Sequence, residues 1–350
     1  MKLLYPLIFL FAFSVSSCEK PKNQDIAIVI HGGAGGIDRS YFSEEQIQAY
    51  ETKLTQARDA GYQVLDNGGS SLDAVQAAII IMEDSPLFNA GKGAVFTADG
   101  QNELDASIMY GADLNTGAIA GVHHIKNPIL AARMVMDKSD HVLLAGDGAE
   151  ILAKQHGIEM VDASYFFTQK RYDQLLKIQG REETTLDHGD SALNERPSYN
   201  DLMDDHKYGT VGAVAIDREG NIAAGTSTGG MTNKKYGRIG DAPLIGSGTY
   251  ANNLTCGLSC TGTGEYFIRT LASHEISAKM KYENKSLKDA MHEVIFNQIG
   301  PLGGEGGIIG LDKNANVVWD FNSSGMFRAY KSSKGSEAVE MFEQTKMPIN

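Results

Sequence analysis

Residues 209–230 read GTVGAVAIDREGNIAAGTSTGG and contain the clearest structural signal of the chain. Two apolar runs of strand length, 211–217 and 221–226, flank the polar turn at 218–220. Such a pattern predicts a β-hairpin. The first run follows a long polar segment, and the second leads into hydroxyls and glycines. The hairpin therefore predicts a sheet whose end carries small polar groups.

Composition and charge limit the class of protein. The chain has 350 residues, of which 42% are hydrophobic and 21% charged, as in an ordinary globular protein with a core. Its formal net charge of −13 is not offset by a basic stripe, so no nucleic-acid partner is expected. The spacing of cysteines and histidines matches no metal site, and Cys256 and Cys260 are expected to be buried free thiols. No cofactor is therefore expected for catalysis.

The N-terminus predicts export. Lys2 gives a positive start, residues 3–15 are almost wholly apolar, and small residues precede Cys18. The apolar stretch is shorter than the roughly 20 residues of a membrane span. Residues 1–18 resemble a bacterial lipoprotein signal, which implies lipidation of Cys18, a periplasmic or cell-envelope location and a tether at 19–24. A plain signal peptide with an incidental cysteine is the alternative.

Strands and helices are expected in both halves of the chain. Besides the hairpin, the expected strands are 25–31, 94–96, 118–122, 141–145 and two or three within 306–330. One helix is expected after a capping box at Ser43 and Gln46, a second at 72–83, and a third that starts at Asn127-Pro128. A further helix is expected to end near 157, and two more cover 265–281 and 286–298. The polar, acidic stretch from about 168 to 208 predicts an exposed linker. These patterns indicate an α/β fold of sheets covered by helices.

Thr210 is a candidate nucleophile. If the chain were cut after Gly209, Thr210 would gain a free α-amine next to its own hydroxyl. The unperturbed pKa of such an amine is about 7.7–8.0, so one residue would supply both nucleophile and general base. Alternatively, Thr210 simply opens a strand, where threonine is common.

Three nearby patterns suit a small polar substrate. Residues 226–231 (TSTGGM) contain hydroxyl groups and flexible glycines, which could form one wall of a small polar binding site. Arg238 and Asp241 pair a cation with an anion in one loop, which complements the carboxylate and ammonium of an α-amino acid, although a salt bridge between them is the alternative. Thr261 and Gly262, at a turn that opens a helix, could form an oxyanion hole. A phosphate-binding loop is less favoured because its lysine is missing.

Several longer motifs carry a family resemblance. They are HGGAGG (31–36), PLFNAGKGAVF (86–96), ELDASIM (103–109), GAIAGV (117–122), NPILAAR (127–133), the segment 209–253, and CTGTGE (260–265). In this order they resemble the isoaspartyl peptidase and plant-type L-asparaginase family of N-terminal-nucleophile hydrolases. The resemblance covers the chain from about residue 25 to about 330, which makes it far more specific than any single motif.

The resemblance implies a fold and a maturation step. The family has a four-layer αββα sandwich and is made as an inactive precursor. Autocleavage would give an α-chain half, residues 25–209, and a β-chain half, residues 210–350. Two such pairs would then assemble as a dimer of heterodimers.

The resemblance also implies a reaction. Thr210 would attack the side-chain amide of L-asparagine or the β-peptide bond of an isoaspartyl dipeptide, so that aspartate is released. Thr228 would orient the nucleophile, and Asn89 would approach it from the first half of the chain.

Four further positions match the substrate site of the family. Arg238 would bind the α-carboxylate of the substrate and Asp241 its α-amine. The Thr261 hydroxyl and the Gly262 N–H would stabilise the oxyanion. Ordinary α-peptides lack a free α-carboxylate and α-amine on one residue and would leave Arg238 and Asp241 without partners. The site is therefore predicted to select against them.

The loop from Met82 to Lys92 resembles one that holds a structural sodium ion through backbone carbonyls. The positions implied are Met82, Glu83, Ser85, Phe88, Ala90 and Lys92. Lys92 stands at a position where family members often have an apolar residue, and its ammonium could compete with the ion.

Two other functions are weighed against this one. Glycosylasparaginase shares the fold, but usually has Asp before the threonine and an STNG-type wall, whereas this chain has Gly209 and the sequence STGG at 227–230. Taspase-like endopeptidases are less favoured because the site suits a free amino acid head. A surface lipoprotein that binds amino acids without catalysis is the alternative from another class.

Overall fold

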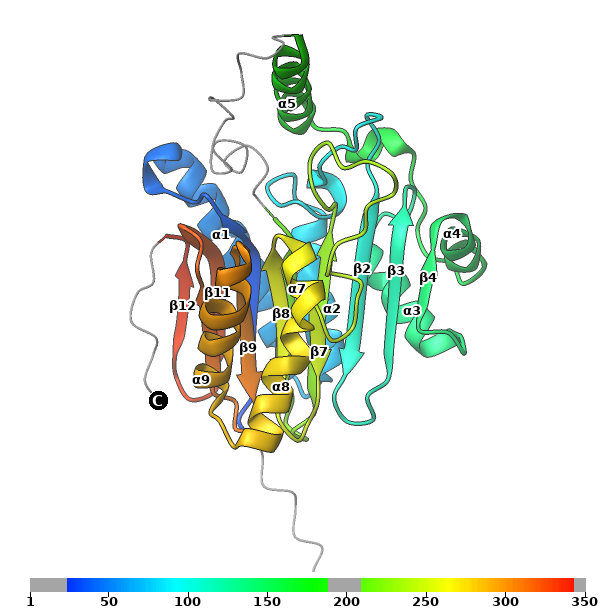
Figure 1. The fold of residues 1–350 in the computed structure, drawn as a ribbon. Coiled ribbons are helices and arrows are strands. Elements are labelled where there is room, and N and C mark those ends of the chain that lie inside the picture. Colours follow the sequence, from blue (N-terminus) through cyan, green and yellow to red (C-terminus); the bar gives the residue numbers. More distant parts are fainter. Residues whose placement is uncertain (1–23, 188–208, 343–350) are drawn as a thin grey trace, which may run out of the picture.

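Four layers make up the structure (Figure 1). The computed structural model describes residues 24–187 and 209–342. Helices cover the outer faces of two sheets that pack against each other, which confirms the predicted αββα sandwich. The signal segment, Cys18, most of the tether and linker residues 188–208 lie outside the described residues. Within the described ranges, no helix is both long and apolar enough to span a bilayer.

The larger sheet has eight strands in the order β12-β11-β1-β5-β6-β2-β3-β4. They are β1 (Ala27–Gly35), β2 (Leu104–Tyr110), β3 (Thr116–Val122), β4 (Leu143–Ala145), β5 (Val211–Ile216), β6 (Ile222–Thr228), β11 (Gly325–Ser332) and β12 (Glu337–Glu340). Neighbours are antiparallel except β3 and β4. The predicted hairpin is confirmed as β5 and β6, with Val211 opposite Ser227.

The smaller sheet is antiparallel, in the order β10-β9-β8-β7. Its strands are β7 (Thr249–Ala251), β8 (Cys256–Gly262), β9 (Gly306–Asp312) and β10 (Val317–Phe321). Apolar residues of both sheets, such as Val214 and Trp319, form one core cluster between them. Cys256 and Cys260 are buried and free, as predicted.

Helices α1 (Glu44–Asp66), α2 (Ser71–Glu83) and α3 (Pro128–Lys138) cover the outer face of the larger sheet. The smaller sheet is covered by α7 (Gly264–Thr270), α8 (Ala272–Glu283), α9 (Leu287–His292) and a π-helix at Glu293–Ile299 (Figure 1). Further elements are α4 (Gly146–Gln155), α5 (Gln169–Asp187), and 3-10 turns at Arg39–Tyr41, Gly91–Gly93, Ala163–Phe166 and Gly300–Leu302.

The predicted start of α1 is confirmed. The Ser43 hydroxyl accepts from the Gln46 amide at 3.2 Å, and the Ser43 amide donates to the Gln46 side chain at 2.9 Å. This capping box satisfies backbone groups that have no partner inside the helix. Pro128 stands in the first turn of α3, where its missing N–H costs nothing.

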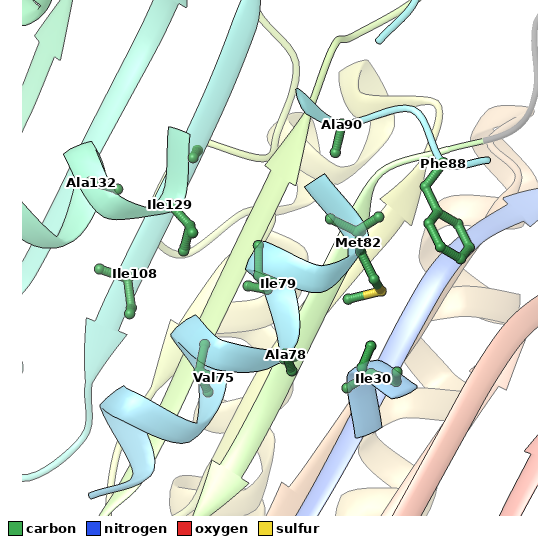
Figure 2. Close-up of a cluster of buried hydrophobic side chains, with 14 of the residues drawn as sticks. Ile30, Val75, Ala78, Ile79, Met82, Phe88, Ala90, Ile108, Ile129 and Ala132 are labelled. Carbon is green, nitrogen blue, oxygen red and sulfur yellow. The ribbon is translucent and has the colours of Figure 1, made fainter. Parts of the chain in front are cut away.

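The core under the larger sheet is built on helical spacing. Val75, Ile79 and Met82 recur every three to four residues along α2, so they share one face of the helix. Figure 2 shows this face together with Ile30 of β1 and Ile108 of β2. All five side chains are fully buried. Burial of each large aliphatic side chain stabilises the fold by about 1.5–3 kcal/mol.

Residues 94–96 do not form the predicted strand. The Asn102 side chain donates to the carbonyls of Ala94 and Val95, both at 3.0 Å, and the Val95 amide donates to Asn89 Oδ1 at 3.0 Å. Side-chain amides thus satisfy backbone groups that a strand would pair with a neighbour. The strand of this region is β2, which was not predicted.

The first part of the predicted linker is the helix α5. Arg171, Leu175 and Ile178 are spaced by four and three residues, and all three are buried on one face of this helix. The surrounding polar residues hid this short apolar stripe in the sequence.

The helix predicted at 265–281 is two helices, broken at Leu271. This residue has a φ of 48°, in the left-handed region. The amides of Ser273 and His274 donate to the carbonyls of Ser247 and Gly246 instead of to the preceding turn. The bend therefore anchors α8 to the loop that precedes β7.

Candidate active site

Thr210 and Thr228 meet at one end of the hairpin. The Thr210 hydroxyl donates to the Thr228 hydroxyl oxygen at 3.1 Å, and the amide of Gly230 donates to the same oxygen at 3.0 Å. Thr210 directly precedes β5, and Thr228 ends β6. Because Val211 is opposite Ser227, the two threonines lie side by side, and both are buried. The loop at Gly230 therefore fixes Thr228, which in turn fixes the rotamer of Thr210.

Asn89 reaches the same place from the first half of the chain. Its backbone amide donates to the carbonyl of Gly209 at 3.3 Å. Its side-chain amide donates to the Gly230 carbonyl at 2.7 Å and accepts from the Val95 amide at 3.0 Å, so it holds two loops together. The Gly209–Thr210 peptide bond thus has a donor at its oxygen and a hydroxyl on its C-terminal side.

Thr261 and Gly262 lie on the other side of this peptide bond. A Cβ atom built on Gly209 would come within 2.9 Å of the Thr261 hydroxyl oxygen. Gly262 has a φ of +149°, and a Cβ there would collide with the Glu305 carbonyl. Glycine is therefore required at the position where a free backbone N–H is expected.

Arg238 is held by Glu265 and not by Asp241. The Arg238 Nε and Nη2 atoms each donate to a Glu265 carboxylate oxygen at 2.8 Å. The simple salt bridge between Arg238 and Asp241 is thus not observed in the described residues. Glu265 was not predicted as a site residue, because the sequence indicated only that it opens a helix.

The Asp241 carboxyl is buried beside Arg238. A Cβ on Gly264 would lie 2.7 Å from Asp241 Oδ1 and 3.1 Å from Arg238 Nη2, so both side chains meet over this glycine. The second Asp241 oxygen, Oδ2, is buried without a hydrogen-bond partner. Burial raises the pKa of Asp241 to about 7, although the Arg238 charge acts in the opposite direction. An anion with an open acceptor thus stands next to a cation, as an α-amino acid requires.

Two more buried polar residues border the site and were not predicted. Asp105 of β2 is opposite Thr228 in the sheet register, and its Oδ1 accepts from the Gly121 amide at 2.8 Å. His31 of β1 lies 2.9 Å, measured from its Nε2, from the Ser259 hydroxyl. Both lie in motifs that carry the family resemblance, and each is a polar residue in a largely apolar strand.

The loop at 82–92 folds back on itself. Side chains at Gly91 and Gly93 would collide with the carbonyl oxygens of Glu83 and Phe88. The Lys92 ammonium lies 5.3 Å from the centre of the Tyr165 ring. This cation–π contact gives the positive charge a partner within the protein. Carbonyl oxygens are ligands that hard cations accept, and the ion at this loop stays a prediction. Among the described residues, no three acidic, histidine or cysteine side chains cluster as a metal site.

Comparison with known proteins agrees with this geometry. A family model described as asparaginase matches residues 24–341. The chain belongs to this family. It is 50% identical over 303 residues to an isoaspartyl peptidase of Salmonella typhimurium, which covers 87% of this chain and 94% of that protein. It is 49% identical over 303 residues to an isoaspartyl peptidase of Escherichia coli, with 87% and 92% covered. It is 39% identical over 307 residues to a plant-type L-asparaginase of Pyrococcus furiosus, with 87% and 96% covered.

Proposed function

We propose that the chain is a self-processing amidohydrolase that releases aspartate from isoaspartyl dipeptides and hydrolyses L-asparagine to aspartate and ammonia. One observation carries this proposal. The Thr210 hydroxyl is hydrogen-bonded to Thr228, and it lies directly after the Gly209–Thr210 peptide bond, whose carbonyl oxygen accepts from the Asn89 amide. The names of the relatives supply both substrate classes.

Processing would begin with the attack of Thr210 Oγ1 on the Gly209 carbonyl carbon. The Thr210 nitrogen leaves and takes a proton, and Gly209 becomes an ester on the threonine oxygen. Water then hydrolyses the ester, which gives the Gly209 carboxylate and a free hydroxyl and amine on Thr210. The Asn89 amide would stabilise the oxyanion of the first step, because it already donates to that oxygen.

The new amine would serve as general base for the Thr210 hydroxyl. The hydroxyl attacks the side-chain carbonyl carbon of the substrate to give a tetrahedral intermediate. The C–N bond then breaks, ammonia or the second amino acid leaves with the proton from the amine, and an acyl-enzyme ester remains on Thr210. Water then releases aspartate. The Thr261 hydroxyl and the Gly262 N–H stabilise the oxyanion in both steps.

Arg238 and Asp241 would hold the head group of the substrate. A guanidinium has five N–H donors, and Glu265 takes two of them. Three donors therefore remain on Nη1 and Nη2, the end of the guanidinium that can bind a second carboxylate in a fork. The free Asp241 Oδ2 accepts from the α-ammonium.

We also propose a structural sodium ion at the 82–92 loop. The backbone carbonyls of the six positions named above would hold it, with Lys92 contributing its carbonyl while its ammonium contacts Tyr165. The ion would fix the loop that carries Asn89. It takes no part in the reaction.

Export and assembly are further proposals. Residues 1–18 support secretion with a lipid anchor at Cys18, in the bacterial periplasm or cell envelope. The family supports a dimer of αβ heterodimers, with residues 25–209 and 210–350 as the two chains.

The test is the intact mass of residues 19–350 after incubation near neutral pH, beside a Thr210→Ala control. Two fragments that divide between 209 and 210, with the control uncut, support the proposal. Release of ammonia from asparagine and of aspartate from an isoaspartyl dipeptide completes it. Turnover of N-glycosyl-asparagine alone would favour glycosylasparaginase. An uncut chain without turnover would favour an amino-acid-binding lipoprotein.

A further inference from the structure

Glu83 is a buried carboxyl group whose side chain the proposed reaction does not use. It ends α2 and is fully buried. Its Oε1 atom accepts from the Ser227 hydroxyl at 2.6 Å and from the Ile129 amide, in the first turn of α3, at 3.0 Å. Burial of a carboxyl group is costly, and apolar side chains of the same shape would avoid this cost. The hydrogen bonds therefore indicate that a defined geometry between these helices and β6 is required.

Ser227 lies on the opposite face of β6 from its two threonine neighbours, because successive side chains of a strand alternate. Thr226 bonds to a hydroxyl of the smaller sheet, so Thr228, two residues on, also faces that sheet. Ser227 faces the helices instead, and its partners across the strands are the apolar residues Val211 and Ala106. The carboxyl group at the end of α2 satisfies the Ser227 hydroxyl in this apolar layer.

The loop that follows α2 is joined to the end of β6 at two points. A Cβ atom on Gly91 would collide with the Glu83 carbonyl oxygen, so the loop returns to its own base. Farther along this loop, the Asn89 carbonyl accepts from the Gly229 amide at 3.1 Å, and the Asn89 side chain donates to the Gly230 carbonyl at 2.7 Å. The Glu83 side chain is thus the first joint between loop and strand, and Asn89 is the second.

The groups of the proposed reaction depend on both joints. Thr228 lies between the joints along β6 and accepts from the Thr210 hydroxyl at 3.1 Å. The Asn89 amide, on the loop, donates to the Gly209 carbonyl at 3.3 Å. The strand therefore holds the nucleophile, and the loop holds the carbonyl that it would attack.

We propose that Glu83 is a positioning residue: its hydrogen bond to Ser227 fixes β6 to the loop and so sets the place of Thr228 relative to Asn89. This inference rests on the proposed role of Thr210 as nucleophile. Glu83 itself touches neither substrate nor reacting atoms. Displacement of a reacting group by about 1 Å can cost roughly 100-fold in rate, so the loss of this bond should be visible in the chemistry.

The first test uses Ser227→Ala, which removes the donor and leaves Glu83 in place. The rate of cleavage at 209–210 is followed by intact mass on freshly purified, uncut protein, and ammonia release from asparagine is measured after cleavage is complete. We expect the cleavage rate and kcat each to fall roughly tenfold, because one lost bond permits a shift of less than about 1 Å. KM should change less than about twofold, since the head group is bound by the loop at 238–241.

Ser277→Ala is the matched control. Ser277 is also buried and bonded to a hydroxyl, that of Thr255 at 2.6 Å, under the smaller sheet. It should change neither rate. A residue that only stabilised the fold would lower the unfolding midpoint and leave both rates unchanged where the protein is folded, and this result for Ser227→Ala would overturn the inference.

The second test varies the acceptor. Glu83→Met keeps the length of the side chain without an acceptor and should lower both rates as Ser227→Ala does. Glu83→Gln should recover most of that loss, because its amide oxygen can replace Oε1 and its nitrogen takes the place of Oε2, which has no hydrogen-bond partner among the described residues. The double variant Ser227→Ala, Glu83→Met should be no slower than either single one, since all three lack the same bond. Losses that multiply would refute the role of the bond.

Sodium provides a further check on the cause. The Glu83 carbonyl, proposed as a ligand of the ion, belongs to the backbone and is kept in every variant. Added sodium chloride should therefore not restore the rates of Ser227→Ala. Restoration would mean that occupancy of the ion site limits the reaction, and the inference would be wrong.

The outcomes separate this inference from the proposed function. If Thr210→Ala stops cleavage and turnover but Ser227→Ala keeps the rates of the unchanged protein, only the role of Glu83 is refuted. If Thr210→Ala is itself cut and active, the proposed nucleophile is wrong and this inference fails with it.

Discussion

The Glu265→Gln substitution tests whether the anchor of Arg238 governs substrate affinity. Glutamine keeps the size of the side chain but offers one acceptor oxygen, and its amide group faces a guanidinium donor. One of the two 2.8 Å bonds is therefore lost. The remaining donors of Arg238 are then no longer held in the orientation that suits a carboxylate.

The magnitude follows from the charge and exposure of the pair. A hydrogen bond to a charged group contributes about 1.5–3 kcal/mol when it is shielded. The Arg238 and Glu265 side chains are 18% and 49% exposed, so water screens the pair. We therefore expect a loss of about 1–1.5 kcal/mol. This corresponds to roughly five- to tenfold in affinity.

The assay is steady-state ammonia release from asparagine. We expect KM to rise by that factor with kcat nearly constant, because the head group is bound alike in ground and transition states. Cleavage at 209–210 should be unaffected, since it involves no substrate. Glu275→Gln is the control, because Glu275 pairs with Lys279 at 3.4 Å on α8, away from the clamp. A fall in kcat with unchanged KM would refute the reasoning.

Three further outcomes are expected. The Asp241 pKa is raised to about 7, so kcat/KM should fall as the pH drops below 7 and the carboxyl gains a proton; a flat profile from pH 6 to 8 contradicts this. Thr228→Val removes the acceptor of the nucleophile hydroxyl and should lower kcat about 10- to 100-fold, whereas Thr255→Val, at another buried hydroxyl pair, should not. Ile79→Ala, in the core, should lower the unfolding free energy by about 2–5 kcal/mol in denaturant titrations. Ile151→Ala, at a side chain 59% exposed, should change that free energy far less, and equal effects would refute the packing argument.

The sequence predicted those parts of the site whose geometry is local. A hairpin fixes its own register, so Thr210 and Thr228 had to meet once two strands with a short turn were recognised. The loop that carries Arg238 and Asp241 is likewise short. Family resemblance added Asn89 and the four-layer fold, which periodicity alone did not reach.

Contacts between distant segments could not be predicted in this way. His31 and Ser259 are 228 residues apart, and nothing local in either strand indicates that they meet. Glu265 is 27 residues from Arg238 and resembles an ordinary first-turn acid of a helix. The false strand at 94–96 has a different origin. Asn89 and Asn102 lie within eight residues of this segment, but hydrogen bonds from their side-chain amides leave no trace in the hydrophobic pattern.

The strand order of the larger sheet has a consequence for a protein that is cut after Gly209, as proposed. β1 precedes residue 209, yet both of its partners, β5 and β11, follow it. A cut at this peptide bond would leave two polypeptides whose strands alternate within one sheet. Their separation would require three ladders of hydrogen bonds to open, between β1 and β11, β1 and β5, and β2 and β6. Unfolding of the cut protein is then also a dissociation, and its midpoint depends on protein concentration. The uncut chain can refold as a single molecule, whereas the two polypeptides of the cut protein must first reassociate. The lifetime of the folded, cut protein is therefore set by the rate at which its strands separate.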